Sequence, residues 1–163
     1  MGTRLWWEQS VRQRFPHIRY VTIRSCGHHK AIIYAWDDQL ALSEEDAAKL
    51  HRYASEWMSP DICVMVKPYN EAAKDQVPSD SPDEDLRKTA LRGKLDQSAV
   101  FTVLNNLFAG VVVSFNRYDV RTGTVHLAAY SHSPFTDNAK SKIRYYAEEL
   151  MPIGSTVDVT YYG

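Results

Sequence analysis

A 27-residue segment of this chain recurs 93 residues later, and this internal similarity constrains the fold more than any local motif. Ser43 to Tyr69 aligns with Thr136 to Tyr162 without a gap. Eight of the 27 pairs are identical: Lys49/Lys142, Tyr53/Tyr146, Ala54/Ala147, Glu56/Glu149, Met58/Met151, Val64/Val157, Val66/Val159 and Tyr69/Tyr162. A fixed period is typical of a chain built from copies of one supersecondary unit. We therefore expect two similar units.

Each copy of the segment has the pattern of a capped helix followed by a strand. Ser43 precedes three acidic residues, an arrangement that satisfies free backbone N–H groups and suits the helix dipole. Apolar residues then recur at helical spacing, and Pro60 is expected to end the helix. Within residues 62–67, the β-branched Ile62, Val64 and Val66 occupy every second position, which predicts a half-buried strand. In the second copy, Thr136 takes the place of the cap.

The correspondence extends upstream once small gaps are allowed. A β-hairpin with glycine in or beside its turn precedes each capped helix, and another helix precedes each hairpin. The expected strand pairs are Ile18 to Arg24 with Ala31 to Trp36, and Val111 to Asn116 with Thr124 to Tyr130; the expected leading helices are Leu5 to Phe15 and Leu86 to Leu107.

The predicted fold class is α+β: a tandem repeat of two αββαβ units, each with two helices on one face of a three-stranded sheet. The first unit is expected at residues 1–69 and the second at 86–163. Between them, residues 70–85 are acidic and poor in large apolar side chains. Such a segment buries too little surface to offset the entropy of ordering, so we interpret it as a flexible linker.

Composition excludes several functional classes. A net charge of −1 argues against a protein that mainly coats nucleic acid or acidic membranes. Two cysteines cannot form a disulfide scaffold, and the sequence has neither a membrane-spanning apolar run nor a signal-peptide pattern. A phosphate-binding glycine loop and a recognisable carboxylate pair are also missing. We expect no enzyme activity, metal or cofactor.

Strand alternation places an apolar and aromatic set of residues on the sheet face that the helices of the first unit do not cover. Exposed apolar patches mark contact sites, although packing of the two sheets on each other or a covering linker would also account for this one. The residues that we expect to make contacts are Tyr20, Ile32, Tyr34, Trp36 and Met65.

Two other features suggest alternative functions. Arg12, Arg14, Arg19 and Arg24 are interleaved with aromatic residues, a combination that can hold phosphates and stack bases. The segment Cys26-Gly27-His28-His29 could carry a nucleophile or a metal, as in a small metal- or thiol-dependent hydrolase, but it lacks further ligands at zinc spacing. A polar glycine turn explains the same four residues.

The order αββαβ resembles the ring-building domains of secretion and sporulation assemblies, which are related to KH domains. The likeness rests on the strand from Ala31 to Trp36, the capped helix that begins at Ser43, Pro60 and the strand around Val64, and on their second copies. It implies a protein that assembles with copies of itself. The GxxG loop of KH domains and the membrane anchor typical of ring-building proteins are absent from the sequence.

The sequence thus favours a non-enzymatic interaction or assembly module that uses a sheet face to bind itself or a protein partner. A KH-like nucleic-acid-binding protein is the first alternative and a small hydrolase the second. The sequence does not determine the compartment: the chain fits a soluble protein, either cytoplasmic or the excised soluble region of an anchored protein.

Overall fold

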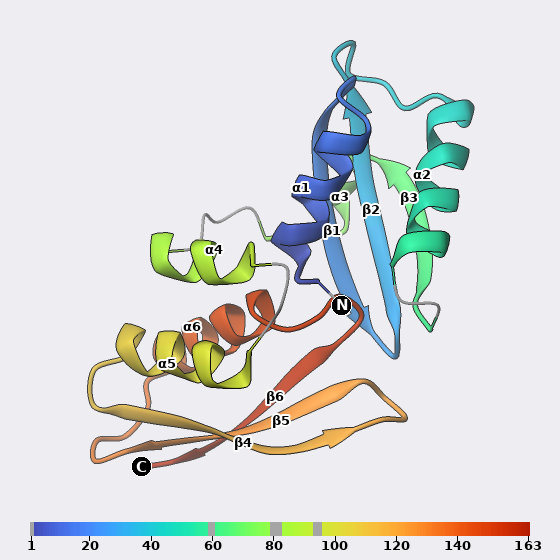
Figure 1. Ribbon diagram of the computed structural model, residues 1–163. Helices are drawn as coiled ribbons and strands as arrows, with labels where there is room; N and C mark the ends of the chain where they lie inside the picture. The colour runs from blue at the N-terminus through green and yellow to red at the C-terminus, as the bar shows by residue number, and fades with distance from the viewer. Residues whose placement is uncertain (1, 59–60, 79–82, 93–95) are drawn as a thin grey trace.

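The protein is α+β. The computed structural model describes residues 2–58, 61–78, 83–92 and 96–163, which form six helices and two three-stranded sheets (Figure 1). In chain order the elements are α1 (Arg4–Arg14), β1 (Ile18–Gly27), β2 (Lys30–Asp37), α2 (Glu44–Trp57), β3 (Cys63–Pro68), α3 (Glu71–Lys74), α4 (Glu84–Ala90), α5 (Gln97–Leu107), β4 (Val111–Asp119), β5 (Thr124–Ser131), α6 (Asp137–Glu149) and β6 (Thr156–Tyr162).

The two sheets have the same strand order and the same senses of pairing. In sheet A, β1 pairs with β2 antiparallel and β2 with β3 parallel. In sheet B, β4 pairs with β5 antiparallel and β5 with β6 parallel. Each sheet therefore has one hairpin and one crossover through a helix, α2 in the first and α6 in the second. The predicted hairpin strands coincide with β1, β2, β4 and β5 to within a few residues.

Side-chain caps fix where the two crossover helices begin. The Ser43 hydroxyl accepts a hydrogen bond from the Asp46 amide, and the Thr136 hydroxyl accepts one from the Ala139 amide, as the sequence predicted. Leu50 and Ala54 of α2, and Ile143 and Ala147 of α6, are fully buried against their sheets. Pro60, the expected end of the first crossover helix, lies outside the described residues.

The predicted single helix from Leu86 to Leu107 is wrong, because this region contains two helices. α4 ends at Ala90, and the Asp96 carboxylate accepts a hydrogen bond from the Ser98 amide to begin α5 at Gln97. Leu86 and Ala90 of α4 are fully buried in the second core. α4 thus adds a third helix to the layer that covers sheet B.

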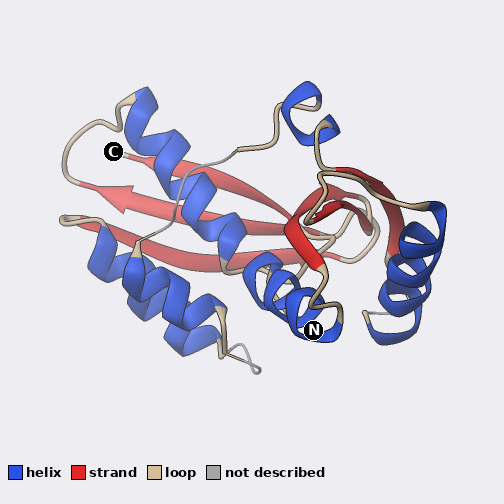
Figure 2. Cartoon of the chain, turned by 90° about the horizontal axis from the view of Figure 1, so that it is seen from above, coloured by secondary structure: helices blue, strands red, loops and turns tan. Residues whose placement is uncertain are grey.

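The sheets lie crosswise, with the N-terminus at their junction and the C-terminus at the far end of sheet B (Figure 1). α1 and α2 cover one face of sheet A, whereas α3 lies over the opposite face (Figure 2). α4, α5 and α6 share one face of sheet B (Figure 1). Each sheet has its own apolar core, but each core also contains one residue from the other half of the chain. Leu5 packs into the core of sheet B, and Ile153 packs into the core of sheet A.

Candidate functional site

The face of sheet A opposite α1 and α2 carries a cluster of three aromatic rings. Tyr20 pairs directly with Trp36 across β1 and β2, and their ring centroids lie 6.2 Å apart. Tyr69, which follows β3, completes the cluster at 5.7 Å from Tyr20 and 5.5 Å from Trp36. We call Tyr20, Trp36 and Tyr69 the sheet A row. Tyr20 is 44% exposed and the other two rings are partly buried.

The start of the segment interpreted as a linker packs over this same face of sheet A. The Asp75 carboxylate accepts a 2.6 Å hydrogen bond from the Tyr34 hydroxyl and lies 3.0 Å from Lys67 Nζ. Arg24 also donates to the Asp75 carbonyl oxygen, at 2.7 Å. We call residues 71–78 the strap. Residues 79–82, also within the predicted linker, lie outside the described residues.

The strap alters the exposure expected for the predicted contact residues. Tyr34, expected to be exposed, is fully buried because the strap covers it, and burial together with the Asp75 carboxylate raises the pKa of its hydroxyl. Ile32 is half-buried, whereas Met65 is 55% exposed on β3. Of the predicted set, the structure brings together Tyr20 and Trp36, and it separates Tyr34 from solvent.

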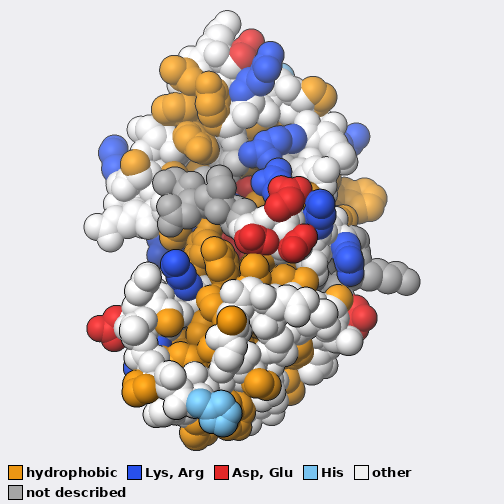
Figure 3. Space-filling model, turned by 90° about the vertical axis from the view of Figure 1, so that its left-hand side faces the viewer, with side chains coloured by type: hydrophobic (Ala, Val, Ile, Leu, Met, Phe, Trp, Pro, Cys, Tyr) orange, Lys and Arg blue, Asp and Glu red, His pale blue; other side chains and the backbone are white. Residues whose placement is uncertain are grey.

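Sheet B carries a row of apolar side chains at the corresponding register. Val112 pairs with Tyr130, and Tyr130 pairs with Tyr162. The two tyrosine rings stack at 4.9 Å with an interplanar angle of 13°. We call Val112, Tyr130 and Tyr162 the sheet B row; each is about half exposed. Hydrophobic side chains gather at this end of the second unit (Figure 3).

The sequence also contains a signal for the sheet B row. Tyr162 is the partner of Tyr69 in the repeated segment, and strand alternation places Val112 and Tyr130 on the outer face. The average polarity of that face obscured the row, because Ser114, Asp158 and Thr160 share it. Pairing register, which the sequence does not give directly, concentrates the three apolar side chains in one line.

The four arginines considered for nucleic-acid binding differ in their contacts. Arg12 donates to the Val21 carbonyl oxygen at the edge of sheet A, and Arg24 holds the strap on the sheet face. Arg14 and Arg19 are exposed. Two of the four guanidinium groups therefore bind the chain's own backbone.

The segment from Cys26 to His29 joins the two units. His28 and His29 both have positive φ angles, 50° and 58°, and form the two-residue turn between β1 and β2. The His28 amide donates to the Thr122 carbonyl oxygen, and the His29 ring Nε2 lies 2.9 Å from the Val120 carbonyl oxygen. The tip of one hairpin thus binds the tip of the other.

Within the same segment, burial raises the pKa of the Cys26 thiol, whereas nucleophilic cysteines have lowered pKa values. Within the described ranges, no group of three His, Cys, Asp or Glu side chains could hold a metal ion.

None of the described helices has the length and apolar character needed to cross a bilayer.

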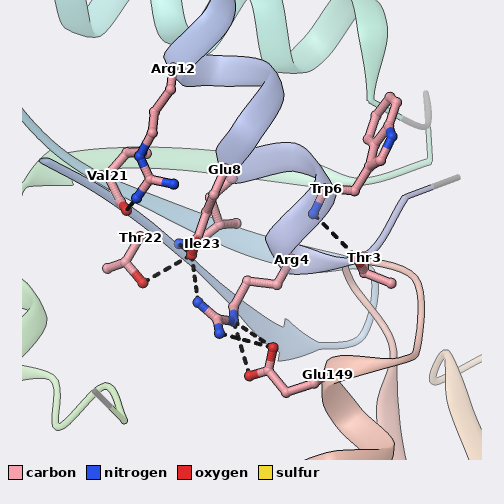
Figure 4. A network of polar contacts seen from close by, with 9 residues as sticks. All are labelled: Thr3, Arg4, Trp6, Glu8, Arg12, Val21, Thr22, Ile23 and Glu149. Carbon is pink, nitrogen blue, oxygen red and sulfur yellow. Dashed lines mark hydrogen bonds and ion pairs between the residues drawn. The ribbon is translucent and has the colours of Figure 1, made fainter. Parts of the chain in front are cut away.

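A buried charged network forms the second connection between the units (Figure 4). Arg4 Nε lies 3.0 Å from both carboxylate oxygens of Glu149, and Arg4 Nη1 lies 2.6 Å from Glu8. Both carboxylates are almost completely buried, and burial raises the pKa of Glu149. One guanidinium therefore balances two carboxylates from the two halves of the chain.

The network also occupies the free edge of sheet A. Glu8 accepts a 2.8 Å hydrogen bond from the Ile23 amide, and Arg12 binds the Val21 carbonyl oxygen, both on the side of β1 that has no strand neighbour (Figure 4). At the corresponding edge of sheet B, Asn105 of α5 accepts from the Val113 amide at 2.7 Å. Helix side chains thus satisfy backbone groups at the β1 edge of sheet A and at the β4 edge of sheet B.

A cavity of about 450 Å³ lies where the units meet. Its walls come from α5, β4 and the turn that follows α6, together with His29 and Ile62 of the first unit. Most of its lining is apolar. Sequence reasoning missed this site, because its walls are far apart in the chain.

Comparisons with protein-family models, curated proteins and solved structures found no match for this chain.

Proposed function

We propose that this protein is a non-enzymatic interaction module that associates with a second copy of itself through the apolar rows on its two sheets. The observation that carries the proposal is the register of these rows. Tyr69 and Tyr162 are equivalent in the repeated segment, and each lies beside an aromatic residue of the central strand, Trp36 or Tyr130.

The exposure of the rows supports this function. Val112 is 59% exposed, Tyr130 48% and Tyr162 49%. Burying large apolar side chains away from water lowers the free energy, so such exposure favours contact with another surface. Contiguous exposed apolar groups mark interaction sites, and tyrosine and tryptophan are enriched among the residues that dominate binding energy. The sheet B row is the more exposed of the two, because all its members are about half exposed, whereas Trp36 and Tyr69 of the sheet A row are partly buried.

We further infer that the two halves are copies of one αββαβ unit related to KH-like ring-building domains. The equal strand order and pairing senses of the two sheets support the duplication. An ancestor with one adhesive face would, after duplication, have given a chain with two. The strap and α4 would be later additions.

Light scattering over a wide concentration range, at low and high salt, tests the proposed function. We expect a discrete oligomer that persists at high salt, because salt screens charge contacts and not apolar ones. The double variant Tyr130→Glu/Tyr162→Glu should shift the protein to monomer, and Tyr20→Glu/Trp36→Glu should weaken association less.

Trp57→Glu is the matched control, since Trp57 is 69% exposed on α2, away from both rows. It should leave the mass unchanged. A wild-type protein that stays monomeric throughout, or association that survives both double variants in the folded state, would contradict the proposal.

A further inference from the structure

The cavity between the units has the dimensions of a small-molecule site. Its volume of about 450 Å³ lies within the range of roughly 300 to 1,000 Å³ typical of ligand pockets. Val100 and Phe101 of α5, with Phe115 and Tyr118 of β4, supply much of its apolar surface. Phe115 and Tyr118, both in the lining, are 45% and 44% exposed.

The walls of the cavity are held in place before any ligand enters. The contact of the His29 ring with Val120 fixes one wall. Gly123 lies close to that wall: a Cβ atom there would approach the Gly154 carbonyl oxygen and His29 Cε1 to 3.3 Å each. A preformed site binds more tightly than a flexible one, because little ordering entropy is lost on binding.

The charged groups of the lining indicate which ligand charge the cavity favours. The lining residues include one carboxylate, Asp61, which is exposed, and no lysine or arginine among the described residues. The nearby positive end of α5 is already capped by the Asp96 carboxylate. His29, Gln97 and Ser155 provide further polar groups around an otherwise apolar site.

We propose that this cavity binds an apolar aromatic molecule with a protonated amine, the rings between α5 and β4 and the ammonium group at Asp61. Aromatic side chains of the lining contact the ring system, and the Asp61 carboxylate attracts the cation. An anionic ligand of the same shape would meet that carboxylate without a compensating lysine or arginine in the described lining. The site therefore distinguishes ligands by the charge of the head group.

Three anthracene derivatives that share one ring system test this selectivity: 9-(aminomethyl)anthracene, 9-anthracenemethanol and 9-anthracenecarboxylate. Their fluorescence reports binding to the intact chain directly. We expect the amine to bind most tightly and the carboxylate most weakly. Asp61→Asn should weaken amine binding about two- to fivefold, as for an exposed ion pair, and leave the alcohol unchanged.

Asp38→Asn is the matched control, because Asp38 is an exposed acid between β2 and α2 and does not line the cavity. Val125→Phe should reduce binding of all three probes, since Val125 lies on the cavity wall. If that variant fails to fold, amide chemical shifts of the wild type locate the site: changes should concentrate in residues 97–101, 118–125 and 150–155.

The proposal is overturned if none of the probes binds saturably, or if the three bind equally and Asp61→Asn changes nothing. Shift changes on the outer sheet faces instead of the cavity would also overturn it. The binding experiment counts protein concentration per chain and does not depend on the apolar rows. Its result is therefore independent of self-association.

Discussion

Arg4 and Glu149 lie 145 positions apart in the chain, yet the guanidinium Nε of one is 3.0 Å from both carboxylate oxygens of the other. This pair joins the first helix to the last, at a point where Glu8 adds a second carboxylate. Removing this partly buried cation would leave each buried carboxylate without a charge partner, which is strongly unfavourable. We therefore expect the pair to couple the stabilities of the two halves of the chain.

Arg4→Met tests this coupling. It leaves Glu8 and Glu149 buried without their shared cation, and we expect the free energy of unfolding to fall by about 3–5 kcal/mol. Urea denaturation measures the change. Arg144→Met is the control: Arg144 pairs with Glu148 at the surface, and its loss should cost at most about 0.5 kcal/mol. Equal effects of the two substitutions would refute the coupling.

Glu149 should also give stability a specific pH dependence. Burial raises its pKa in the folded protein above the ordinary value of 4.5, so between these two values the folded state binds more protons than the unfolded state. The contribution of Glu149 is therefore greatest below pH 4.5 and is lost as the pH rises through the folded pKa. Relative to Glu149→Gln, the wild type should lose stability over that window, measured by urea unfolding at a series of pH values.

Asp75 should act in the opposite sense. The hydrogen bond from Tyr34 lowers its pKa below 3.8, with Lys67 adding to the effect, so its contribution is present above 3.8 and is lost as the pH falls through the folded pKa. The stability difference between the wild type and Asp75→Asn should shrink on acidification below 3.8. Hydrogen exchange of the strap amides should accelerate in the same range. A difference that grows in acid would count against the proposed anchoring of the strap.

Asn105→Ala tests the protected edge of sheet B. It removes the acceptor of the Val113 amide, and an unsatisfied, partly buried donor should cost about 1–3 kcal/mol. Asn106, its exposed neighbour in α5, provides the control, and Asn106→Ala should change thermal stability little. Comparable effects at the two positions would mean that the hydrogen bond from the Val113 amide to Asn105 does not stabilise the β4 edge.

Gly27→Ala tests the junction of the hairpins. Gly27 has a φ of 74°, and an added Cβ would lie 2.8 Å from Thr156 Cγ2. Gly110 has a similar φ of 76° with nothing within 4 Å of the same position. Backbone strain should cost about 1–2 kcal/mol at each site, and the contact with Thr156 should make Gly27→Ala the more destabilising variant. Thermal unfolding of the two variants gives the comparison.

Local patterns in the sequence identified most of the strands and helices, because their signals lie within a few residues. Ser43 and Thr136 act as caps through bonds to amides three positions away. Asp96 illustrates the limit: it begins a second helix inside a stretch that was predicted to be one helix. Its capping role depends on where the previous helix ends.

The candidate sites were less accessible to sequence reasoning. Alternation correctly placed Tyr34 on the face opposite Leu50, but its burial depends on Asp75, which is 41 residues away. One wall of the cavity depends on the contact between the His29 ring and the Val120 carbonyl oxygen, two residues that lie 91 positions apart in the chain. No periodic pattern encodes such contacts, because they follow from how segments far apart in the chain pack together.

The capped sheet edges have a consequence for how this protein can associate. An exposed strand edge lets backbone pairing continue from one molecule to the next without end, as in amyloid. Glu8, Arg12 and Asn105 occupy the backbone groups that such growth would use on β1 and β4. This protection applies to one edge of each sheet, since β3 and β6 form the opposite edges. Growth by backbone pairing from one molecule to the next is therefore directed away from β1 and β4.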